Sequence, residues 1–293
     1  MAVPATSMPV IDAHQHFWDP DTADYPWMVG DFRPLRRSYG PGDLQPELRS
    51  VGVARTVVVQ ARHDLDETHE LLGIAAMTDW VVGVVGWVDL TAADVGDALT
   101  RLRERPEGRW LVGVRHQVHD EPEADWLLRR DVLRGLSVVA DAGLAYDLLV
   151  RPRELPAAVE LAGRIPHLRL VVDHLAKPPV ASGAVEPWGS LLGRFGELEN
   201  VTCKVSGLVT EADWRRWKAS DLRPYVERAV EVFGPDRLMF GSDWPVCLLA
   251  GSYSEVWEAT AEILGTLLGT SLESVMGACA ARVYRLELSA PQT

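Results

Sequence analysis

The sequence predicts a single α/β domain that folds as a (β/α)8 TIM barrel. Its 293 residues suit such a barrel, which typically takes about 250 residues. Eight short apolar runs alternate with stretches whose apolar residues recur at helical spacing. Eight such repeats within one domain favour a closed barrel of parallel strands over an open sheet.

The predicted strands are runs of Val, Ile and Leu almost without interruption, as expected for parallel strands that are buried on both faces. We expect them, in chain order, at residues 9–14, 55–60, 80–88, 111–116, 145–150, 168–174, 201–205 and 237–241. The stretch EADWLLRRDVLRGLSVVADAG between the fourth and fifth runs has helical spacing and ends in glycine. The barrel should span residues 9–288 and follow an extended or disordered segment at 1–8.

An open dinucleotide-binding sheet is the alternative fold, and it should show GxGxxG after its first strand. Here the first run leads into HQHFWDP, and the chain has no GKS/T phosphate loop. The longest irregular stretch, 17–46, directly follows the first strand and is rich in Pro, Asp and aromatic residues. Because a loop this long in a compact domain is usually functional, we expect it to border the site.

The composition argues against several classes of partner. With 29 basic and 42 acidic side chains the net charge is −13, which disfavours binding to nucleic acid or to an anionic membrane. The three cysteines show no CxxC spacing, and no apolar run reaches the roughly 20 residues that span a membrane. Since the first residues also lack a signal-peptide pattern, we expect a cytoplasmic protein that acts on a small molecule. The oligomeric state is left open.

Polar residues gather at the carboxyl ends of the predicted strands, where barrel enzymes carry their catalytic groups. In chain order they are His14, His16, Gln60, Arg115, His116, Tyr146, Asp147, Asp173, His174, Lys177, Lys204 and Asp243. This concentration predicts an active site at that end of the barrel.

His14 and His16 should point to the same side of their strand, together with Asp12, because side chains alternate along a strand. Two imidazoles a few ångströms apart can share a metal ion. They can equally be a hydrogen-bonded pair at a strand end. Asp243 and His174 at other strand ends favour the metal or catalytic interpretation.

Several of these residues have two interpretations. Asp243 can accept a proton from water or bind a metal, or it can cap the following turn. His174 can be a ligand, a donor to a carbonyl, or a buried structural histidine, whereas Asp173 should face the other way in a structural ion pair. Only one of Arg115 and His116 can face the barrel interior, and alternation does not decide which.

Candidate substrate contacts lie at the same strand ends and in the first loop. Tryptophans suit the flat apolar faces of sugars, although packing explains any single one of them, and lysines at two strand ends can arise by chance. The candidates are Trp27, Gln60, His116, Tyr146, Lys177 and Trp244. His63, His119 and His167 are expected to be solvated.

Six motifs in order carry a family resemblance: IDAHQHFWDP, YPWM, VVVQA, GVRHQV, VVDHLAKP and MFGSDWPV. Over residues 9–286 the chain resembles the amidohydrolase-2 group of metal-dependent-hydrolase-like barrels. Within that group it is most similar to the sugar lactonase branch, which includes L-fuconolactonase and L-rhamnonolactonase.

The resemblance implies that Asp243 is the general base that activates water, while His174 and Arg115 orient and polarise a lactone carbonyl. It implies a metal site at His14, His16 and Asp243, with His174 as a further ligand candidate. The chain lacks the bridging lysine or glutamate of binuclear members at strand four and the histidine of many mononuclear members at strand five. A divalent metal, zinc if one is present, should therefore be mononuclear, and it can be dispensable.

The expected reaction is hydrolysis of an aldono-1,4- or 1,5-lactone to the sugar acid. One alternative is another reaction on the same barrel, either decarboxylation of an aromatic acid or hydrolysis of a non-sugar lactone or carboxylic ester. A ligand-binding barrel without catalysis is the other alternative. The joint presence of His14, His16, His174 and Asp243 argues against it.

Overall fold

The computed structural model describes residues 8–288, and the chain forms a (β/α)8 barrel, which confirms the predicted fold class. Eight parallel strands in this part of the chain pair in the sequential order β1 to β8. The strands are β1 (Ile11–Gln15), β2 (Arg55–Val59), β3 (Val81–Gly86), β4 (Leu111–His116), β5 (Ala145–Leu148), β6 (Arg169–Val172), β7 (Val201–Val205) and β8 (Leu238–Phe240). Apart from Met8, the segment predicted to be extended at 1–8 lies outside the described residues.

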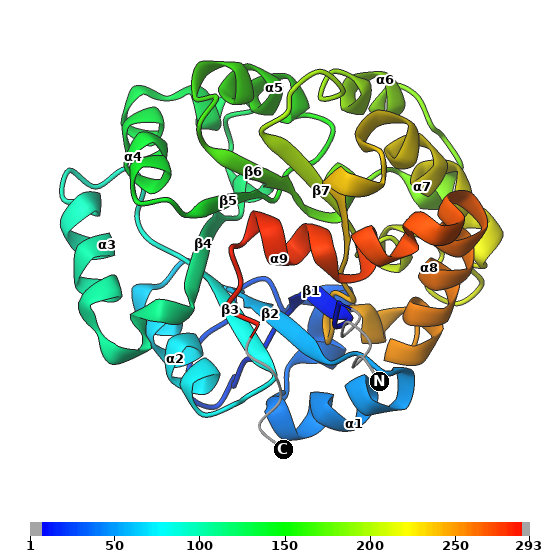
Figure 1. Cartoon of the computed structure of the whole chain (residues 1–293), viewed down its shortest axis with the longest axis horizontal. Helices are drawn as coiled ribbons and strands as arrows, with labels where there is room; N and C mark the ends of the chain where they lie inside the picture. Colours follow the sequence, from blue (N-terminus) through cyan, green and yellow to red (C-terminus); the bar gives the residue numbers. More distant parts are fainter. Residues whose placement is uncertain (1–7, 289–293) are drawn as a thin grey trace, which may run out of the picture.

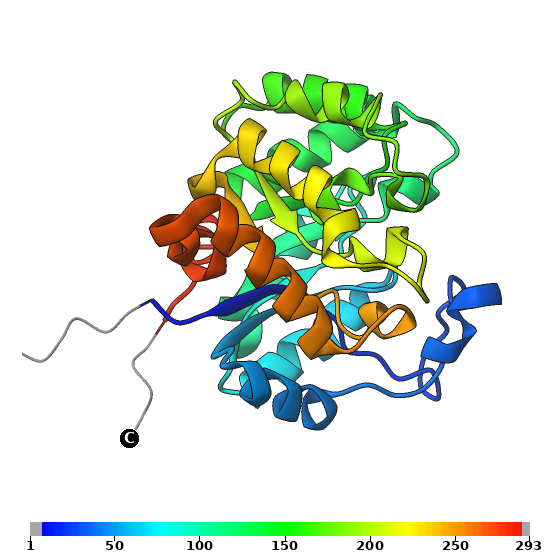
Figure 2. The ribbon, with the colours of Figure 1, turned by 90° about the vertical axis from the view of Figure 1, so that its right-hand side faces the viewer.

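Helices surround the strands and close one end of the barrel (Figure 1). The outer helices are α1 (Pro41–Val51), α2 (Leu65–Ala76), α3 (Val95–Glu104), α4 (Arg130–Asp141), α5 (Leu155–Arg164), α6 (Trp188–Gly193), α7 (Ala219–Phe233) and α8 (Tyr253–Leu268). The short α9 (Cys279–Val283) crosses the centre of the ring of strands in Figure 1. In Figure 2 the loop after β1, drawn in blue, projects on the side of the barrel opposite the red segment that holds α9.

Two apolar clusters account for the buried core. The larger one lies between the strands and the outer helices. The smaller one fills the barrel interior with alternate strand residues and the residues around α9, among them Ile11, Val57, Val85, Val171, Met239, Cys279 and Tyr284. Because α9 fills the N-terminal end of the barrel, polar groups can gather only toward the C-terminal end.

The barrel closes between β8 and β1 through the residues that directly follow β8. The Asp243 backbone N–H donates to the His14 carbonyl at 2.8 Å, and the His16 N–H donates to the Trp244 carbonyl at 2.7 Å. Gly241 allows this approach, since a Cβ there would lie 2.6 Å from the His14 Cβ. The seam therefore holds Asp243 beside the two histidines of β1.

The prediction that Asp12 points the same way as His14 and His16 is wrong. The pairing of β1 with β2 shifts register between Asp12 and Gln15, so simple alternation does not hold along this strand. The Asp12 carboxylate accepts hydrogen bonds from the Tyr253 hydroxyl of α8 at 3.0 Å and from the Ser242 N–H at 2.9 Å. Asp12 thus links β1 to the segment after β8 and to α8, on the outer side of the barrel.

The remaining sequence expectations concern the cysteines and membrane spans. Cys203, Cys247 and Cys279 are buried and form no disulfide. Among the described residues no single helix is long and apolar enough to cross a membrane. One pair, Tyr253–Ser271 with Ser274–Val283, passes on length and composition, but its two parts are bent by 104°.

Candidate active site

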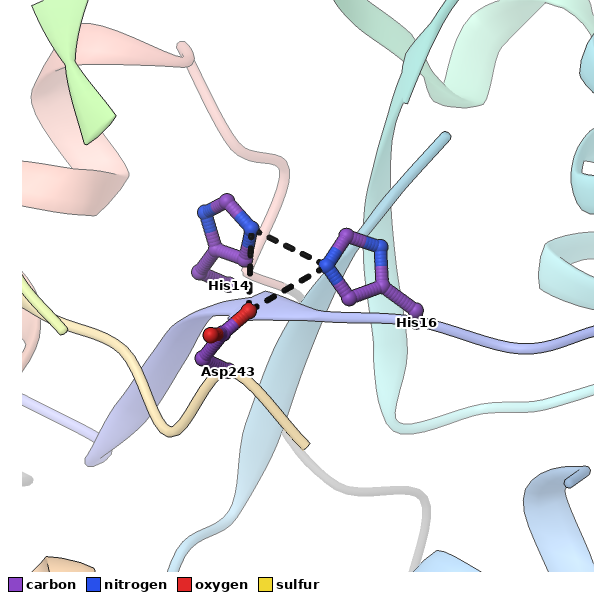
Figure 3. Close-up of side chains that lie close together, drawn as sticks. All are labelled: His14, His16 and Asp243. Atoms are coloured by element: carbon purple, nitrogen blue, oxygen red, sulfur yellow. Dashed lines mark hydrogen bonds and ion pairs between the residues drawn. The ribbon is translucent and has the colours of Figure 1, made fainter. Parts of the chain in front are cut away.

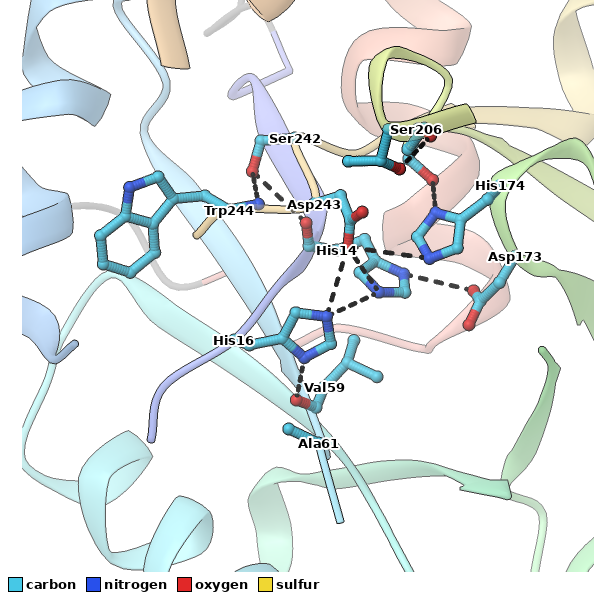
Figure 4. Close-up of polar contacts among 12 residues, drawn as sticks. His14, His16, Val59, Ala61, Asp173, His174, Ser206, Ser242, Asp243 and Trp244 are labelled. Atoms are coloured by element: carbon cyan, nitrogen blue, oxygen red, sulfur yellow. Dashed lines mark hydrogen bonds and ion pairs between the residues drawn. The ribbon is translucent and has the colours of Figure 1, made fainter. Parts of the chain in front are cut away.

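Three imidazoles surround one carboxylate oxygen at the C-terminal end of the barrel (Figure 4). Figure 3 shows two of them, His14 and His16, beside Asp243. Asp243 Oδ1 lies 3.4 Å from His16 Nε2, 3.7 Å from His14 Nε2 and 3.7 Å from His174 Nε2. The Nε2 atoms of His14 and His16 are 3.2 Å apart, and all four side chains are buried. These residues, His14, His16, His174 and Asp243, are called the rim cluster below.

Hydrogen bonds to the outer ring nitrogens orient two of the imidazoles. His16 Nδ1 is 2.7 Å from the Val59 carbonyl. Because a carbonyl oxygen only accepts, this contact puts the His16 proton on Nδ1 and leaves the Nε2 lone pair facing Asp243. His174 Nδ1 is 2.8 Å from the Ser206 hydroxyl (Figure 4), and this contact fixes the direction of its ring.

The backbone at two of these residues adopts a left-handed conformation. Asp243 has φ 59°, and the four residues from His174 to Lys177 have φ between 51° and 58°. Such φ values are costly outside glycine and are concentrated at functional sites. Gly207 faces the His174 ring, where a Cβ would come 2.5 Å from Nδ1. The turn after β6 (η5, Asp173–Ala176) thus aims His174 at Asp243.

Burial sets the charge of the rim cluster. Desolvation lowers the pKa of His16, and it lowers the pKa of His14 and His174 well below the usual value. Desolvation alone would raise the pKa of Asp243, but His174 and His16 together bring it below its ordinary value. At neutral pH the site therefore combines neutral imidazoles with one carboxylate, which can accept a proton from water or bind a cation.

A second group of polar residues lies beneath the rim cluster, and we call it the floor cluster: Arg115, Asp147, Asp173, Lys204 and Tyr284. Lys204 Nζ is 2.5 Å from Asp147 Oδ2 and 3.0 Å from Asp173 Oδ1. Arg115 Nη1 donates to Asp173 Oδ2 at 3.0 Å. The Tyr284 hydroxyl, just after α9, donates to Asp147 at 2.8 Å. Two acids and two cations thus balance one another inside the barrel.

Arg115, and not His116, faces the barrel interior. Arg115 Nη1 is 3.2 Å from His14 Nε2, and Nη2 donates to the Gln60 backbone carbonyl. The His116 ring is stacked between His63 and Trp126, with centroid distances of 3.9 Å and 4.3 Å. His116 Nε2 pairs with Glu121 at 2.8 Å.

Gln60, Trp27 and Lys177 each contact other protein groups. Gln60 is fully buried and donates to Gln117 Oε1 at 3.0 Å. Trp27, in the loop after β1, is partly exposed and donates to the Ala61 carbonyl at 2.9 Å. Lys177 Nζ pairs with Glu211 at 2.9 Å. The substrate contacts expected of these three residues stay predictions.

Tyr146 and Trp244 lie in the outer apolar cluster between strands and helices. The side chain that β5 presents to the interior is Asp147, which contacts Lys204. The Trp244 indole points away from the imidazoles (Figure 4) and stacks edge-on with Tyr39 at 5.4 Å. Their substrate roles, like that of His116, also stay predictions.

Sequence reasoning missed most of the floor cluster. Asp173 was expected to face away from the site, yet its Oδ1 lies 3.3 Å from His14 Nδ1. Asp173 keeps the alternation of β6, because Val171 also faces the barrel interior. It is His174 that departs from alternation, since its left-handed φ brings its ring to the same side as Asp173. Strand parity alone could have found Asp147, because its neighbours Tyr146 and Leu148 are the apolar residues of β5.

The donor atoms of the rim cluster fit a divalent metal ion. Ligand atoms of His14, His16 and Asp243 all lie within 4.8 Å of one another, as do those of His14, Asp173 and His174. Neutral imidazole nitrogens and a carboxylate are preferred ligands of zinc. The hydrogen bond from His16 Nδ1 to a carbonyl is the outer contact that metal-binding histidines usually make.

Comparison with known proteins identifies the family of this chain. The profile of the family described as Amidohydrolase matches residues 11–286. An L-fucono-1,5-lactonase of Burkholderia ambifaria is 39% identical over 94% of this chain and 96% of its own length. An L-fucono-1,5-lactonase of Burkholderia multivorans is 40% identical over the same shares. A crystal structure of a Burkholderia multivorans amidohydrolase with bound zinc, 40% identical, superposes with a TM-score of 0.89 over 95% of this chain and all of that one.

Proposed function

Because this chain belongs to the amidohydrolase family, we propose that it is a hydrolase that opens a sugar-derived lactone to the sugar acid. Two L-fucono-1,5-lactonases that match nearly its whole length support this choice of substrate class. The observation that carries the proposal is the single Asp243 oxygen with three imidazole Nε2 atoms around it. The substrate is then an aldono-1,4- or 1,5-lactone, similar to L-fuconolactone.

In the proposed mechanism Asp243 acts as the general base. Its carboxylate removes a proton from water as the water oxygen attacks the lactone carbonyl carbon. The negative charge that develops on the carbonyl oxygen is stabilised by His174 and by the positive field of Arg115. The C–O bond to the ring oxygen then breaks, and the proton passes from Asp243 or His174 to that oxygen. The product is the open sugar acid.

Arg115 acts through its charge in this scheme. Both terminal nitrogens already donate to protein acceptors, namely Asp173 and Gln60. The guanidinium is nevertheless only 3.2 Å from His14 Nε2 and nearly inaccessible to solvent. A buried cation at this distance is weakly screened, so it favours negative charge in the rim cluster.

His14, His16 and Asp243 would hold a divalent metal, with His174 as a further ligand, and we propose zinc as a mononuclear ion. When bound, such an ion polarises a carbonyl and makes water more acidic, to a pKa of about 7. Lactones are activated esters, so Asp243 and the surrounding donors can support hydrolysis without it. The metal then accelerates the reaction and is not required for it.

We also propose that the enzyme works in carbohydrate metabolism in the cytoplasm. The sugar acids that its relatives' names imply support the first point. Three buried free thiols fit a reducing compartment.

The test is a proton-release screen of aldonolactones, run with and without a chelator, on wild type, on Asp243→Asn and on Asp97→Asn. Asp97 lies exposed on α3, so this variant controls for loss of a carboxylate elsewhere. We expect turnover of at least one aldonolactone, lowered but not abolished by the chelator. No turnover of any aldonolactone would overturn the substrate class, and release of carbon dioxide from an aromatic acid would favour the decarboxylase alternative.

A further inference from the structure

His14 differs from the other two rim imidazoles because each of its ring nitrogens faces both a hydrogen-bond donor and an acceptor. Nδ1 lies 3.2 Å from Lys204 Nζ and 3.3 Å from Asp173 Oδ1. Nε2 lies 3.2 Å from Arg115 Nη1 and 3.2 Å from His16 Nε2. A neutral imidazole has one N–H and one lone pair, so it can use only one contact of each kind.

In the first tautomer the His14 proton is on Nε2. Its N–H then donates to His16 Nε2, which is free to accept because the His16 proton is on Nδ1 beside the Val59 carbonyl. The Nδ1 lone pair accepts from Lys204, which also donates to Asp147 and lies 3.0 Å from Asp173 Oδ1. One N–H of Arg115 loses its acceptor.

In the second tautomer the proton is on Nδ1. It donates to Asp173 Oδ1, a buried oxygen that has no hydrogen bond of good geometry among the described residues, although Lys204 Nζ lies 3.0 Å away. The Nε2 lone pair then accepts from Arg115. Here it is Lys204 that loses one acceptor. Each tautomer therefore satisfies His14 fully and leaves one hydrogen of one cation unmatched.

We propose that His14 is held between these two tautomers, and that Lys204 and Arg115 compete for its single lone pair. Donation from Lys204 favours the tautomer with its lone pair on Nδ1, in which the His14 Nε2–H is a donor in the rim cluster. Donation from Arg115 favours the tautomer with its lone pair on Nε2, so that His14 offers a lone pair there. Lys204 is then a positioning residue, since it contacts His14 and the floor acids and acts on the reaction through His14.

The consequence for catalysis rests on the proposed lactone hydrolysis. With the N–H on Nε2, His14 can donate to a carbonyl oxygen in the absence of a metal. With the lone pair on Nε2, the same ring can serve as a metal ligand beside His16. One arrangement of side chains thereby supports both the metal-free and the metal-loaded site, with no movement of the backbone.

The test is the ¹⁵N NMR spectrum of histidine-labelled protein without metal or substrate, because protonated and unprotonated ring nitrogens have distinct shifts. The His14 signals are those missing from His14→Gln. We expect wild type to lie between the two tautomers, Lys204→Met to move to Nδ1–H, and Arg115→Met to move to Nε2–H. Lys218→Met, on the exposed third lysine, should match wild type. Identical His14 tautomers in wild type and both variants would overturn the proposal, whatever the lactone assay gives.

Lys204→Met leaves the Asp147 carboxylate without its cation, so it can destabilise the fold. The double variant Lys204→Met/Asp147→Asn removes one charge of each sign and should show the same shift to Nδ1–H. Zinc affinity, measured by competition with a coloured chelator, gives a second readout. Both single variants lose one positive charge. Only Lys204→Met shifts the His14 proton to Nδ1 and so leaves the Nε2 lone pair free to bind the metal. We therefore expect it to bind zinc several-fold more tightly than Arg115→Met, and equal or weaker binding would contradict the proposal.

Discussion

The rim and floor clusters share the barrel interior, yet they differ in how their charges are paired. In the floor cluster two acids and two cations lie 2.5–3.0 Å apart. In the rim cluster one carboxylate oxygen lies 3.4–3.7 Å from three neutral imidazoles. Most floor residues come from the strands and from the segment after α9. Two of the four rim residues, His174 and Asp243, come from left-handed turns.

The floor cluster therefore contributes to stability and the rim cluster to reactivity, although the two lie only a few ångströms apart. The two acids and two cations of the floor cluster balance in charge, and α9 closes the barrel on the other side of them. The rim has a negative charge and lone pairs in excess, which favour a proton, a cation or a polarised substrate. The two regions should therefore respond differently to substitution.

Asp243→Asn should break the rim without disturbing the floor. Asparagine has the same shape and tolerates a left-handed φ, so the fold should be retained. Loss of the general base should lower kcat by about 10²–10⁴-fold, measured by proton release on the best lactone. Asp97→Asn is the matched control, and near-normal turnover by Asp243→Asn would refute the assignment.

Asp147→Ala should break the floor. It leaves the buried Lys204 ammonium short of one counter-charge, which costs about 3–5 kcal/mol of the free energy of unfolding. Urea denaturation of the single variants and of Asp147→Ala/Lys204→Met completes a double-mutant cycle. We expect the double variant to recover more than half of that loss. A double variant as unstable as the sum of the singles would show that the pair does not act as a unit.

Glu67 is a buried acid outside both clusters. Comparing it with Asp173 shows how a neighbouring cation changes the pKa of a buried carboxyl group. Burial raises the pKa of Glu67 to about 7, although Oε2 accepts hydrogen bonds from the Ala61 and Arg62 N–H groups. Asp173 is just as buried, but Lys204 holds its pKa well below the usual value.

The sign of the Glu67 effect follows from linkage. The folded state binds this proton more tightly than the unfolded state, so stability should fall as the pH rises from about 4.5 through 7. Between pH 5 and pH 8 the loss is roughly 2–3 kcal/mol. Glu67→Gln should remove this part of the pH dependence in urea denaturation curves. An unchanged dependence in the variant would rule out Glu67 as its source.

Tyr284→Phe should give the smallest effect. It removes a hydroxyl that donates to Asp147 and leaves the ring in place, which costs about 1–2 kcal/mol. Thermal unfolding measures the loss. kcat/KM should stay at the wild-type value, since the hydroxyl contacts no rim residue. A fall in kcat/KM would mean that the two clusters are more tightly coupled than their contacts indicate.

The fold and the rim cluster could be predicted from sequence because their signals are local. Eight apolar runs alternating with helical patterns indicate the barrel. Since every strand ends at the same edge, His14, His16, His174 and Asp243 had to meet there. The quoted motifs also identified the family, which the profile match over residues 11–286 confirms.

The floor cluster could not be predicted in the same way. Its strand members keep the alternation of their strands, since Asp147 and Asp173 lie two residues after the interior Ala145 and Val171. The left-handed turn after β6 instead brings His174 to the same side as Asp173, so taking His174 as the interior residue placed Asp173 on the wrong face. Tyr284 lies in the turn that follows α9, and in sequence it is far from the end of every strand. Alternation fails in β1 and directly after β6, next to His14 and at His174, and the sequence carries no local sign that it does.

The seam between β8 and β1 also has a consequence for biosynthesis. His14 is made among the first residues and Asp243 among the last fifty or so, and their backbones are hydrogen-bonded to each other. A nascent chain on the ribosome therefore carries half of its active site through nearly the whole of translation without the other half. Contacts this distant in sequence form late and slowly. Catalytic competence should therefore arrive with the final closure of the barrel, and fragments released before β8 emerges should be inert.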